Sequence, residues 1–319
     1  FDNVKENIKN LKNGEVALLD NIRFFAGEEK NDRTLAKKLA GLADIFVLDG
    51  FAVAHRDSAS VTGVAKYLPA YAGLLFAQEI EILSGILEKP KHPMVVILGG
   101  AKVETKIPVL KNLLSKADHI LIGGGIFNTY LFAKGYNVGK SLIGKEYKKE
   151  ILKYCSNKKI VLPVDFVVGK ENGKEARVIE MKGEGGKEKW GGVIKKDEAI
   201  YDVGPRTVQL YSKYIKKAQT LIWNGAVGMF ETHPYEYGSF SLAHLFAARS
   251  KSKAFGVGGG GETVEILKKL KLMQDVDLVS TGGGAMLEYL GGKKLPGLKA
   301  FEKKFGGFKI LNFINLFIN

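Results

Sequence analysis

The stretch that decides the fold is PMVVILGG, residues 93–100, an apolar run that stops abruptly at two glycines. The pattern returns five times along the chain, as HILIGGG (119–125), IVLPVD (160–165), TLIWNG (220–225), AFGVGGGG (254–261) and DLVSTGGG (277–284). Short strands that are apolar throughout are buried on both faces, which favours a parallel sheet covered by helices. We therefore predict a strand at each of these places.

Helix-like stretches separate the predicted strands, at 109–117, 207–217, 241–250 and 262–272. Strands that alternate with helices predict a doubly wound α/β domain, in which ligands bind beyond the carboxyl ends of the strands. Almost all of the clustered glycine lies there, so we expect the site at this edge. The Gly- and Lys-rich segment 166–200 has turn signals at Asn172-Gly173 and 183–186, and it predicts a surface hairpin.

The residues before this domain predict a second, smaller one. The apolar runs 15–19 and 45–48 are expected to be buried strands of another α/β domain, each followed by a loop with an arginine. Two strands are too few to close a core, so this domain is expected to be incomplete. The fold class is therefore two Rossmann-like, doubly wound parallel-sheet domains joined by a hinge helix. The expected parts are an amino-terminal domain at 1–73, a connecting helix and linker at 74–92, the main domain at 93–290 and a tail at 291–319 that returns to the first domain.

Composition places the chain among ordinary globular proteins. Of its 319 residues, 45% are hydrophobic and 26% are charged, with a single cysteine, Cys155. One cysteine forms no disulfide within the chain, which indicates the cytoplasm. The apolar runs fall short of the roughly 20 residues that cross a bilayer, so no membrane partner is expected. The net charge of +14 comes from lysines scattered along helices without stacking aromatics, which argues against a nucleic-acid-binding module.

Glycines at successive strand ends point to phosphate binding. Without a Cβ atom, their N–H groups can approach a ligand closely, and at a helix start they carry the positive end of the dipole. Neither the P-loop nor the early dinucleotide fingerprint is present. The run 256–261 matches the second pattern formally, but it follows a late strand and precedes Glu262, so a dinucleotide dehydrogenase is only the runner-up enzyme.

Several longer motifs resemble phosphoglycerate kinase. These are GGAKV at 99–103 with Lys106, WNGAVGMFE at 223–231, GGGET at 259–263, STGGGA at 280–285, DNIRF at 20–24 and AHR at 54–56. They occur in the family's order from about Val16 to Leu298. The resemblance implies reversible phosphoryl transfer between 1,3-bisphosphoglycerate and MgADP, giving 3-phosphoglycerate and MgATP.

The resemblance also assigns the nucleotide side of the site. Lys102 and Lys106 would contact the nucleotide phosphates and the migrating phosphoryl group, and Glu231 would accept from the ribose hydroxyls. Glu262 would hold Mg²⁺ through the nucleotide. The adenine slot would be lined by Gly123, Gly124 and Leu142. The remaining nucleotide- and phosphate-binding residues would be Gly99, Gly100, Asn224, Gly260, Gly261, Thr263, Gly283 and Gly284. Pro108 suits a first helical turn, so a helix is expected to begin near Lys106.

On the substrate side, Arg23 and Arg56 match the arginines that hold 3-phosphoglycerate, because a guanidinium binds oxyanions in a bidentate manner. Two residues depart from the family's pattern in the nucleotide motifs: Glu262 replaces an aspartate and Ala226 replaces a proline. Leu48, Gly50 and Ala52 depart from it near Arg56.

The family's chain begins with strand and helix units that have no counterpart before Phe1, and they carry further acid-binding residues. We therefore expect either processing or a start inside a longer gene. The chain alone is expected to be a monomer that binds adenine nucleotide but turns over poorly. The alternatives that remain open are a truncated, inactive nucleotide-binding homologue and a basic nucleic-acid-binding module.

Overall fold

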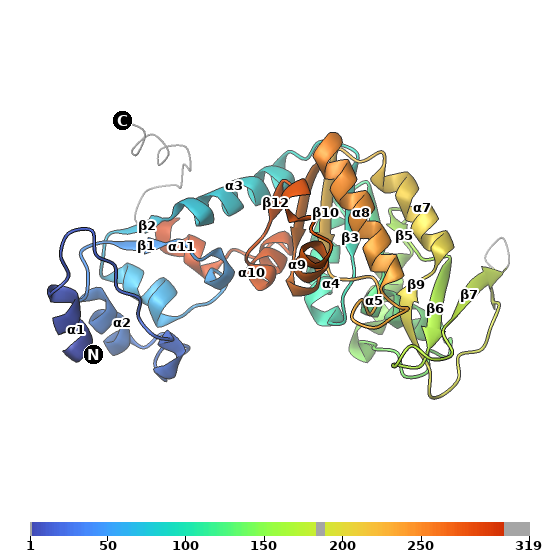
Figure 1. Cartoon of the computed structure of the whole chain (residues 1–319), viewed down its shortest axis with the longest axis horizontal. Helices are drawn as coiled ribbons and strands as arrows, with labels where there is room; N and C mark the ends of the chain where they lie inside the picture. Colours follow the sequence, from blue (N-terminus) through green and yellow to red (C-terminus); the bar gives the residue numbers. More distant parts are fainter. Residues whose placement is uncertain (1, 183–188, 303–319) are drawn as a thin grey trace. The chain divides into compact units, whose positions relative to one another are not determined.

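The computed structural model describes residues 2–182 and 189–302, which form two compact units (Figure 1). One unit contains the residues up to Ile82 and the described residues from Lys293 onward. The other unit is Leu83–Gly292. The division falls inside helix α3 (Leu74–Glu88), the helix expected to connect the domains.

The larger unit is built on a six-stranded parallel sheet in the order β12-β11-β10-β3-β4-β5. The six predicted strands are the six strands of this sheet. Their bounds are β3 (Met94–Leu98), β4 (His119–Ile122), β5 (Ile160–Val161), β10 (Thr220–Asn224), β11 (Phe255–Gly259) and β12 (Leu278–Val279). All five residues of β3 and of β10 are buried, as expected for strands covered on both faces.

The strand order shows that this unit is doubly wound. From β3 the chain moves outward through β4 to β5, and from β10 it moves the other way through β11 to β12. Because parallel crossovers are right-handed, the helices of the two halves cover opposite faces. One layer contains α4 (Val103–Leu113), α5 (Gly124–Ala133) and α6 (Lys148–Cys155), with α10 (Gly283–Leu290) packed on α4. The other contains α7 (Pro205–Ile215), α8 (Tyr237–Ser252) and α9 (Gly261–Lys269).

The neighbours β3 and β10 mark the point where the winding reverses. They pair in parallel along their whole length, from Met94 opposite Thr220 to Leu98 opposite Asn224. At such a switch point the two following loops diverge to opposite faces and leave a crevice at the carboxyl edge. The fold thus places a ligand site after Leu98 and Asn224.

The core of this unit packs large side chains between the sheet and the α7–α8 layer. Trp223 on β10 is fully buried, and its ring meets Phe246 of α8 edge-on at 5.6 Å. Tyr211 of α7 is also fully buried, and its hydroxyl donates to the carbonyl of Ile122 at 2.6 Å. Its hydrogen bond to the end of β4 satisfies a polar atom that burial would otherwise leave unpaired.

A four-stranded antiparallel sheet, ordered β8-β7-β6-β9, replaces the predicted surface hairpin. Its strands are β6 (Asp165–Gly169), β7 (Arg177–Lys182), β8 (Lys189–Trp190) and β9 (Ala199–Val203). The hairpin itself is present as β6 and β7, but β9 pairs with β6 as well, and Phe166 packs on Phe127 of α5. The description as a mere surface insertion was therefore wrong. The predicted turn at 183–186 lies outside the described residues.

The smaller unit contains a two-stranded parallel sheet of β1 (Phe46–Leu48) and β2 (Ala70–Ala72). Besides the first part of α3, its helices are α1 (Asp2–Lys9), α2 (Arg33–Ala40) and α11 (Pro296–Glu302). The strand expected at 45–48 is present as β1, but it is not buried as expected, since Val47 is 54% exposed. The segment 15–19 is not a strand, and Leu18 is 97% exposed. That prediction was wrong because an apolar run becomes a strand only where a neighbour pairs with it. The strand β2 was not predicted.

Short helical turns complete the two units. The 3₁₀ turns are Ile22–Phe24, Phe51–Val53, Val64–Lys66, Lys145–Tyr147 and Met273–Asp275, and one π-helical turn is Ala59–Gly63. In the smaller unit, Phe76 contacts Phe51 and Phe301 edge-on, at 6.1 and 5.8 Å between ring centroids. Within residues 2–182 and 189–302, no helix combines the length and the apolar character needed to span a bilayer.

Candidate active site

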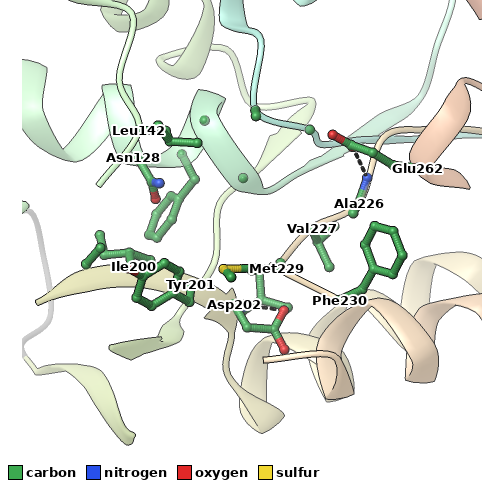
Figure 2. A pocket seen from close by; sticks show the side chains of 18 of the residues that line it. Asn128, Leu142, Ile200, Tyr201, Asp202, Ala226, Val227, Met229, Phe230 and Glu262 are labelled. Atoms are coloured by element: carbon green, nitrogen blue, oxygen red, sulfur yellow. Dashed lines mark hydrogen bonds between the residues drawn. The ribbon is translucent and has the colours of Figure 1, made fainter. Parts of the chain in front are cut away.

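A cavity of about 460 Å³ opens at the switch point of the parallel sheet (Figure 2). Its lining includes Gly100 after β3, Gly124 at the start of α5 and the residues from Ala226 to Glu231 after β10. The opposite wall comes from β9 and includes Ile200 and Tyr201. The volume lies within the range of pockets that hold nucleotide-sized ligands.

The glycine loops at this edge are joined to one another by backbone hydrogen bonds. Gly100 N donates to the carbonyl of Ala226 at 2.6 Å, and Gly125 N donates to the carbonyl of Gly100 at 2.9 Å. Gly100 has φ +93°, and a Cβ atom there would lie 3.0 Å from Glu262 Oε2 and 3.3 Å from Lys106 Cε. The positive φ favours glycine at this position, and a Cβ atom there would crowd the ends of the two charged side chains.

Lys106, Asn224 and Glu262 come together beside this loop. Lys106 is buried in α4, and its Nζ donates to Asn224 Oδ1. Burial lowers the pKa of Lys106 to about 8, and the nearby charge of Glu262 opposes that shift. A buried ammonium with one carboxylate neighbour is ready to receive a further anion, as phosphate binding requires.

The helix that carries Lys106 begins earlier than predicted. It starts at Val103, with Lys102 at its N-cap, so Lys106 lies one turn inside and Pro108 is in the helix interior. The prediction of a start near Lys106 was wrong. Lys102 is exposed, directly follows the lining residue Ala101 and is the N-cap of α4, at the positive end of the helix dipole.

The two later glycine runs meet at the ends of β11 and β12. Gly260 has φ +94° and caps α9, and a Cβ atom on Gly283 would lie 3.1 Å from Gly260 Cα. A Cβ atom on Gly260 itself would lie 3.0 Å from Asn224 Nδ2. The helices α9 and α10 therefore start side by side next to Asn224. The N–H groups of a first turn have no acceptor within their own helix, so they can donate to a ligand.

The structure thus gathers most of the residues predicted for the nucleotide side. Those that line the cavity are Gly100, Gly124, Leu142, Glu231 and Glu262. Other predicted residues do not line the cavity but are within two positions of a lining residue, or contact one of the residues described above. They are Gly99, Lys102, Lys106, Gly123, Asn224, Gly260, Gly261, Thr263 and Gly283. Gly284 is the second residue of α10, directly after Gly283.

The two predicted substrate arginines lie in the smaller unit. Arg23 is exposed in the 3₁₀ turn Ile22–Phe24, which Asn21 caps by accepting from Arg23 N. Arg56 is half-buried, and its Nε is buried without a hydrogen-bond partner among the described residues.

Sequence reasoning missed the wall that β9 contributes. Figure 2 shows Ile200, Tyr201, Asp202 and Met229 on the side of the cavity opposite Leu142 and Asn128. Asp202 accepts from Gly238 N at 2.6 Å and Val203 N at 2.8 Å, and burial raises its pKa well above the ordinary value. An aspartate inside the apolar run 199–203 was the available signal, but the glycine and lysine around it favoured a surface loop.

One carboxylate of the cavity suits a divalent cation carried by a nucleotide. Glu262 is in the first turn of α9 and lines the cavity. Oxygen ligands suit Mg²⁺, which in nucleotide sites takes most of its ligands from phosphates and water. The described residues contain no cluster of three or more His, Cys, Asp and Glu side chains that could hold a metal.

The fold and the site together define a class of protein. The domain is doubly wound, and its switch point has glycine-rich loops, a buried lysine and a cavity large enough for a base. These are the features of a nucleotide-binding phosphotransferase domain.

The particular family follows from comparison with known proteins. A model of the phosphoglycerate kinase family matches residues 1–293. The chain is 45% identical over 308 residues to phosphoglycerate kinase of Thermosipho africanus, covering 94% of this chain and 74% of that one. It is 44% identical over 300 residues to the enzyme of Zymomonas mobilis, covering 92% and 73%.

Solved structures agree with this match. The phosphoglycerate kinase of Pyrococcus horikoshii superposes with a TM-score of 0.81 at 33% identity, covering 95% of this chain and 76% of that chain. That of Coxiella burnetii gives a TM-score of 0.76 at 42% identity, covering 89% and 72%. The chain belongs to the phosphoglycerate kinase family, the ATP-binding phosphotransferases of glycolysis.

Proposed function

We propose that this chain transfers a phosphoryl group between 1,3-bisphosphoglycerate and MgADP, with the switch-point cavity as its nucleotide site. The observation that carries this proposal is the convergence of Lys106, Asn224 and Glu262 with amide-rich strand ends beside a base-sized cavity. Phosphoryl transfer depends on positioning and charge neutralisation more than on covalent catalysis, and this site offers both.

The base and ribose occupy the cavity in this proposal. Gly124 and Leu142 border the slot for the adenine, with Gly123 behind them, and Glu231 accepts from the ribose hydroxyls. The wall of Ile200, which is buried, and Tyr201, which is half-buried, lies across the cavity from Leu142 (Figure 2) and supports the flat face of a base.

The phosphates lie over the glycine edge. Lys106 and Lys102 neutralise phosphate charge, while the first-turn amides of α9 and α10, at Gly261, Thr263, Gly283 and Gly284, donate to phosphate oxygens. Gly99, Gly100 and Gly260 let the phosphates approach the backbone. Mg²⁺, when bound with the nucleotide, supplies further charge neutralisation, and Glu262 is the residue that would hold it.

The acid substrate binds to the smaller unit through Arg23 and Arg56. A buried Nε without a protein partner is rare, because desolvated donors normally find an acceptor. In Arg56 that donor fits a carboxylate or phosphate oxygen of 3-phosphoglycerate. Arg23 is exposed, and its neighbour Asn21 fixes the turn beneath it.

We further propose that a polypeptide of these 319 residues binds MgADP but turns over poorly. In the smaller unit the described residues form a sheet of only two strands, and apolar side chains such as Leu18 and Phe24 are exposed. A substrate-binding domain with so small a sheet and such exposed apolar surface is not expected to hold its arginines rigidly. Loss of accurately placed arginine charge costs roughly 10³- to 10⁵-fold in phosphoryl transfer.

Two measurements on the full 319-residue chain test the proposal. Calorimetry should detect MgADP binding, and a coupled assay with 3-phosphoglycerate and MgATP should detect slow turnover. The variant Arg56→Gln should abolish 3-phosphoglycerate binding, while Arg33→Gln, at an exposed position of α2, should leave it unchanged.

The outcomes separate the alternatives. MgADP binding with no detectable 3-phosphoglycerate binding would indicate the nucleotide-binding homologue that lacks activity. Turnover at the rate of a full-length family member would refute the impairment, and absence of MgADP binding would refute the assigned site.

A further inference from the structure

The carboxylate of Glu262 is held by a backbone amide of the loop after β10. Glu262 Oε2 accepts from Ala226 N at 2.9 Å, across 36 positions of sequence (Figure 2). Both residues line the nucleotide cavity, and Ala226 is buried while Glu262 is half-buried. This hydrogen bond therefore lies at the edge of the site rather than on the outer surface.

The amide that holds the carboxylate is itself fixed by its neighbours. Gly225 N donates to Thr263 Oγ1 at 2.8 Å, and Val227 N donates to Ser239 Oγ at 3.1 Å. On the other side of the peptide, the carbonyl of Ala226 accepts from Gly100 N. The loop therefore has hydrogen bonds on both sides of residue 226 besides the one to Glu262.

The cation beside Glu262 does not replace this amide. Lys106 donates from Nζ to Asn224 Oδ1, and its effect on Glu262 is through charge. Glutamate has one more rotatable bond than aspartate, so a longer carboxylate keeps a fixed direction only when a donor holds one of its oxygens. The Ala226 amide is the donor that the structure provides at 2.9 Å.

We propose that Ala226 is a positioning residue, whose N–H aims the Glu262 carboxylate at the cation of the bound nucleotide. This inference rests on the proposed nucleotide site. A proline at 226 would have no N–H to donate, and an aspartate at 262 would be one methylene shorter, so either change would remove this hydrogen bond.

Titration calorimetry with ADP, in excess Mg²⁺ and in EDTA, tests the pair. Ala226→Pro removes the donor and should reduce the Mg²⁺-dependent gain in ADP affinity about tenfold, the size expected for a hydrogen bond to a charged group. Affinity for metal-free ADP should change by less than about twofold, because that ligand makes no use of the carboxylate's direction. Glu262→Asp should cause a similar loss, since the shorter side chain no longer spans to the amide.

The double variant A226P/E262D is the decisive measurement. Residues that act as one unit give strongly non-additive effects, so the double variant should lose no more than either single variant. Ser239→Ala serves as the matched control, because it removes the acceptor of two other amides of the same loop, Val227 N and Gly228 N. It should weaken ADP binding equally with and without Mg²⁺.

Each result has a distinct meaning. Equal losses with and without Mg²⁺ in Ala226→Pro, or additive losses in the double variant, would overturn the positioning role while leaving the nucleotide site intact. Absence of ADP binding in the unaltered chain would instead overturn the proposed function. Glu262→Asp leaves the loop backbone unchanged, so it tests the inference even if the proline variant does not fold.

Discussion

The two units of this chain treat apolar side chains in opposite ways. In the larger unit every residue of β3 and β10 is buried between layers of helices. In the smaller unit the apolar run 15–19 has no strand partner among the residues that the structure describes, and Val16 is 90% exposed. Similar local sequence thus gives a central strand in one place and an exposed segment in the other. The difference lies in whether neighbouring strands and covering helices are present to pair with it.

The units differ in their charged groups too. The larger unit surrounds its buried Lys106 with Asn224 and Glu262, which together define a site. In the smaller unit, Arg56 has a buried Nε without a partner among the described residues, and Arg23 is exposed. In the larger unit, contacts among the protein's own side chains define the site. In the smaller unit, a bound acid substrate would accept the hydrogen bonds of the two arginines.

The largest contrast is expected between core residues of one unit and apolar residues of the other. Trp223→Ala should destabilise the larger unit by about 3–5 kcal/mol, because a fully buried ring packed on Phe246 leaves a large cavity. Phe24→Ala, at a side chain 75% exposed, should change stability by about 0.5 kcal/mol or less. Denaturant unfolding followed by circular dichroism measures both. Equal shifts would show that burial does not distinguish the two units as described.

The next contrast lies within α4, between one buried and one exposed lysine. Lys106→Met keeps the apolar stem and removes the charge, so it should weaken MgADP binding by about 10- to 100-fold, as loss of a charged hydrogen bond to phosphate predicts. Lys111→Met, at an exposed position of the same helix, should change the affinity by less than about twofold. Calorimetry at pH 7 compares them, and similar losses would indicate a general effect of charge rather than a site.

Much of the larger unit could be predicted from the sequence, and the reasons are physical. A strand buried on both faces must be apolar throughout. The apolar runs that end at Gly99, Gly123 and Gly225 therefore predicted the strands and also the sheet edge at which a ligand binds. The motifs around Lys106 and Glu262 then indicated the family. Their convergence in space follows from the strand order, which places β3, β10 and β11 side by side.

Other parts could not be predicted because they depend on distant contacts. The segment 15–19 was predicted to be a strand from its own composition, but pairing decides that outcome. The β9 wall was obscured by glycine and lysine in the residues around it, although Phe166 and Ile179 anchor that sheet on α5. The hydrogen bond from Ala226 to Glu262 joins positions 36 apart, and both residues looked like isolated departures from a motif.

An acid titration tests how much the ion pair between Glu198 and Arg177, in the antiparallel sheet, stabilises the larger unit. Glu198 is buried next to the pocket residues Ala199 and Ile200, and two hydrogen bonds from Arg177, at 2.7 and 2.8 Å, lower its pKa to about 2. A lowered pKa stabilises the fold above the ordinary value of 4.5, and this stabilisation is lost as the pH falls from there toward 2. The melting temperature should therefore drop over that range.

The variant Glu198→Gln isolates this contribution. It should have a lower melting temperature than the unaltered chain at pH 7, and the two values should converge as the pH falls below 4.5. Arg206→Gln is the matched control, because it breaks an exposed ion pair, Arg206 with Glu180, in the same part of the fold. A constant difference between Glu198→Gln and the unaltered chain at all pH values would contradict the assignment.

The smallest effect on stability is expected at the exposed segment of the smaller unit. Leu18 is 97% exposed, so Leu18→Ser should change the free energy of unfolding by about 0.5 kcal/mol or less. Its effect should appear in association instead, since exposed apolar surface promotes contact between copies. Light scattering during concentration should show less aggregation for Leu18→Ser than for the unaltered chain.

The comparison variant Leu221→Ser, at a fully buried position of β10, should lower stability and increase aggregation, because it removes core packing and leaves a buried hydroxyl without a partner. If Leu18→Ser unfolded the protein as readily as Leu221→Ser, the segment around residue 18 would have to be packed, and the contrast between the two units would fail at the residue that shows it most clearly.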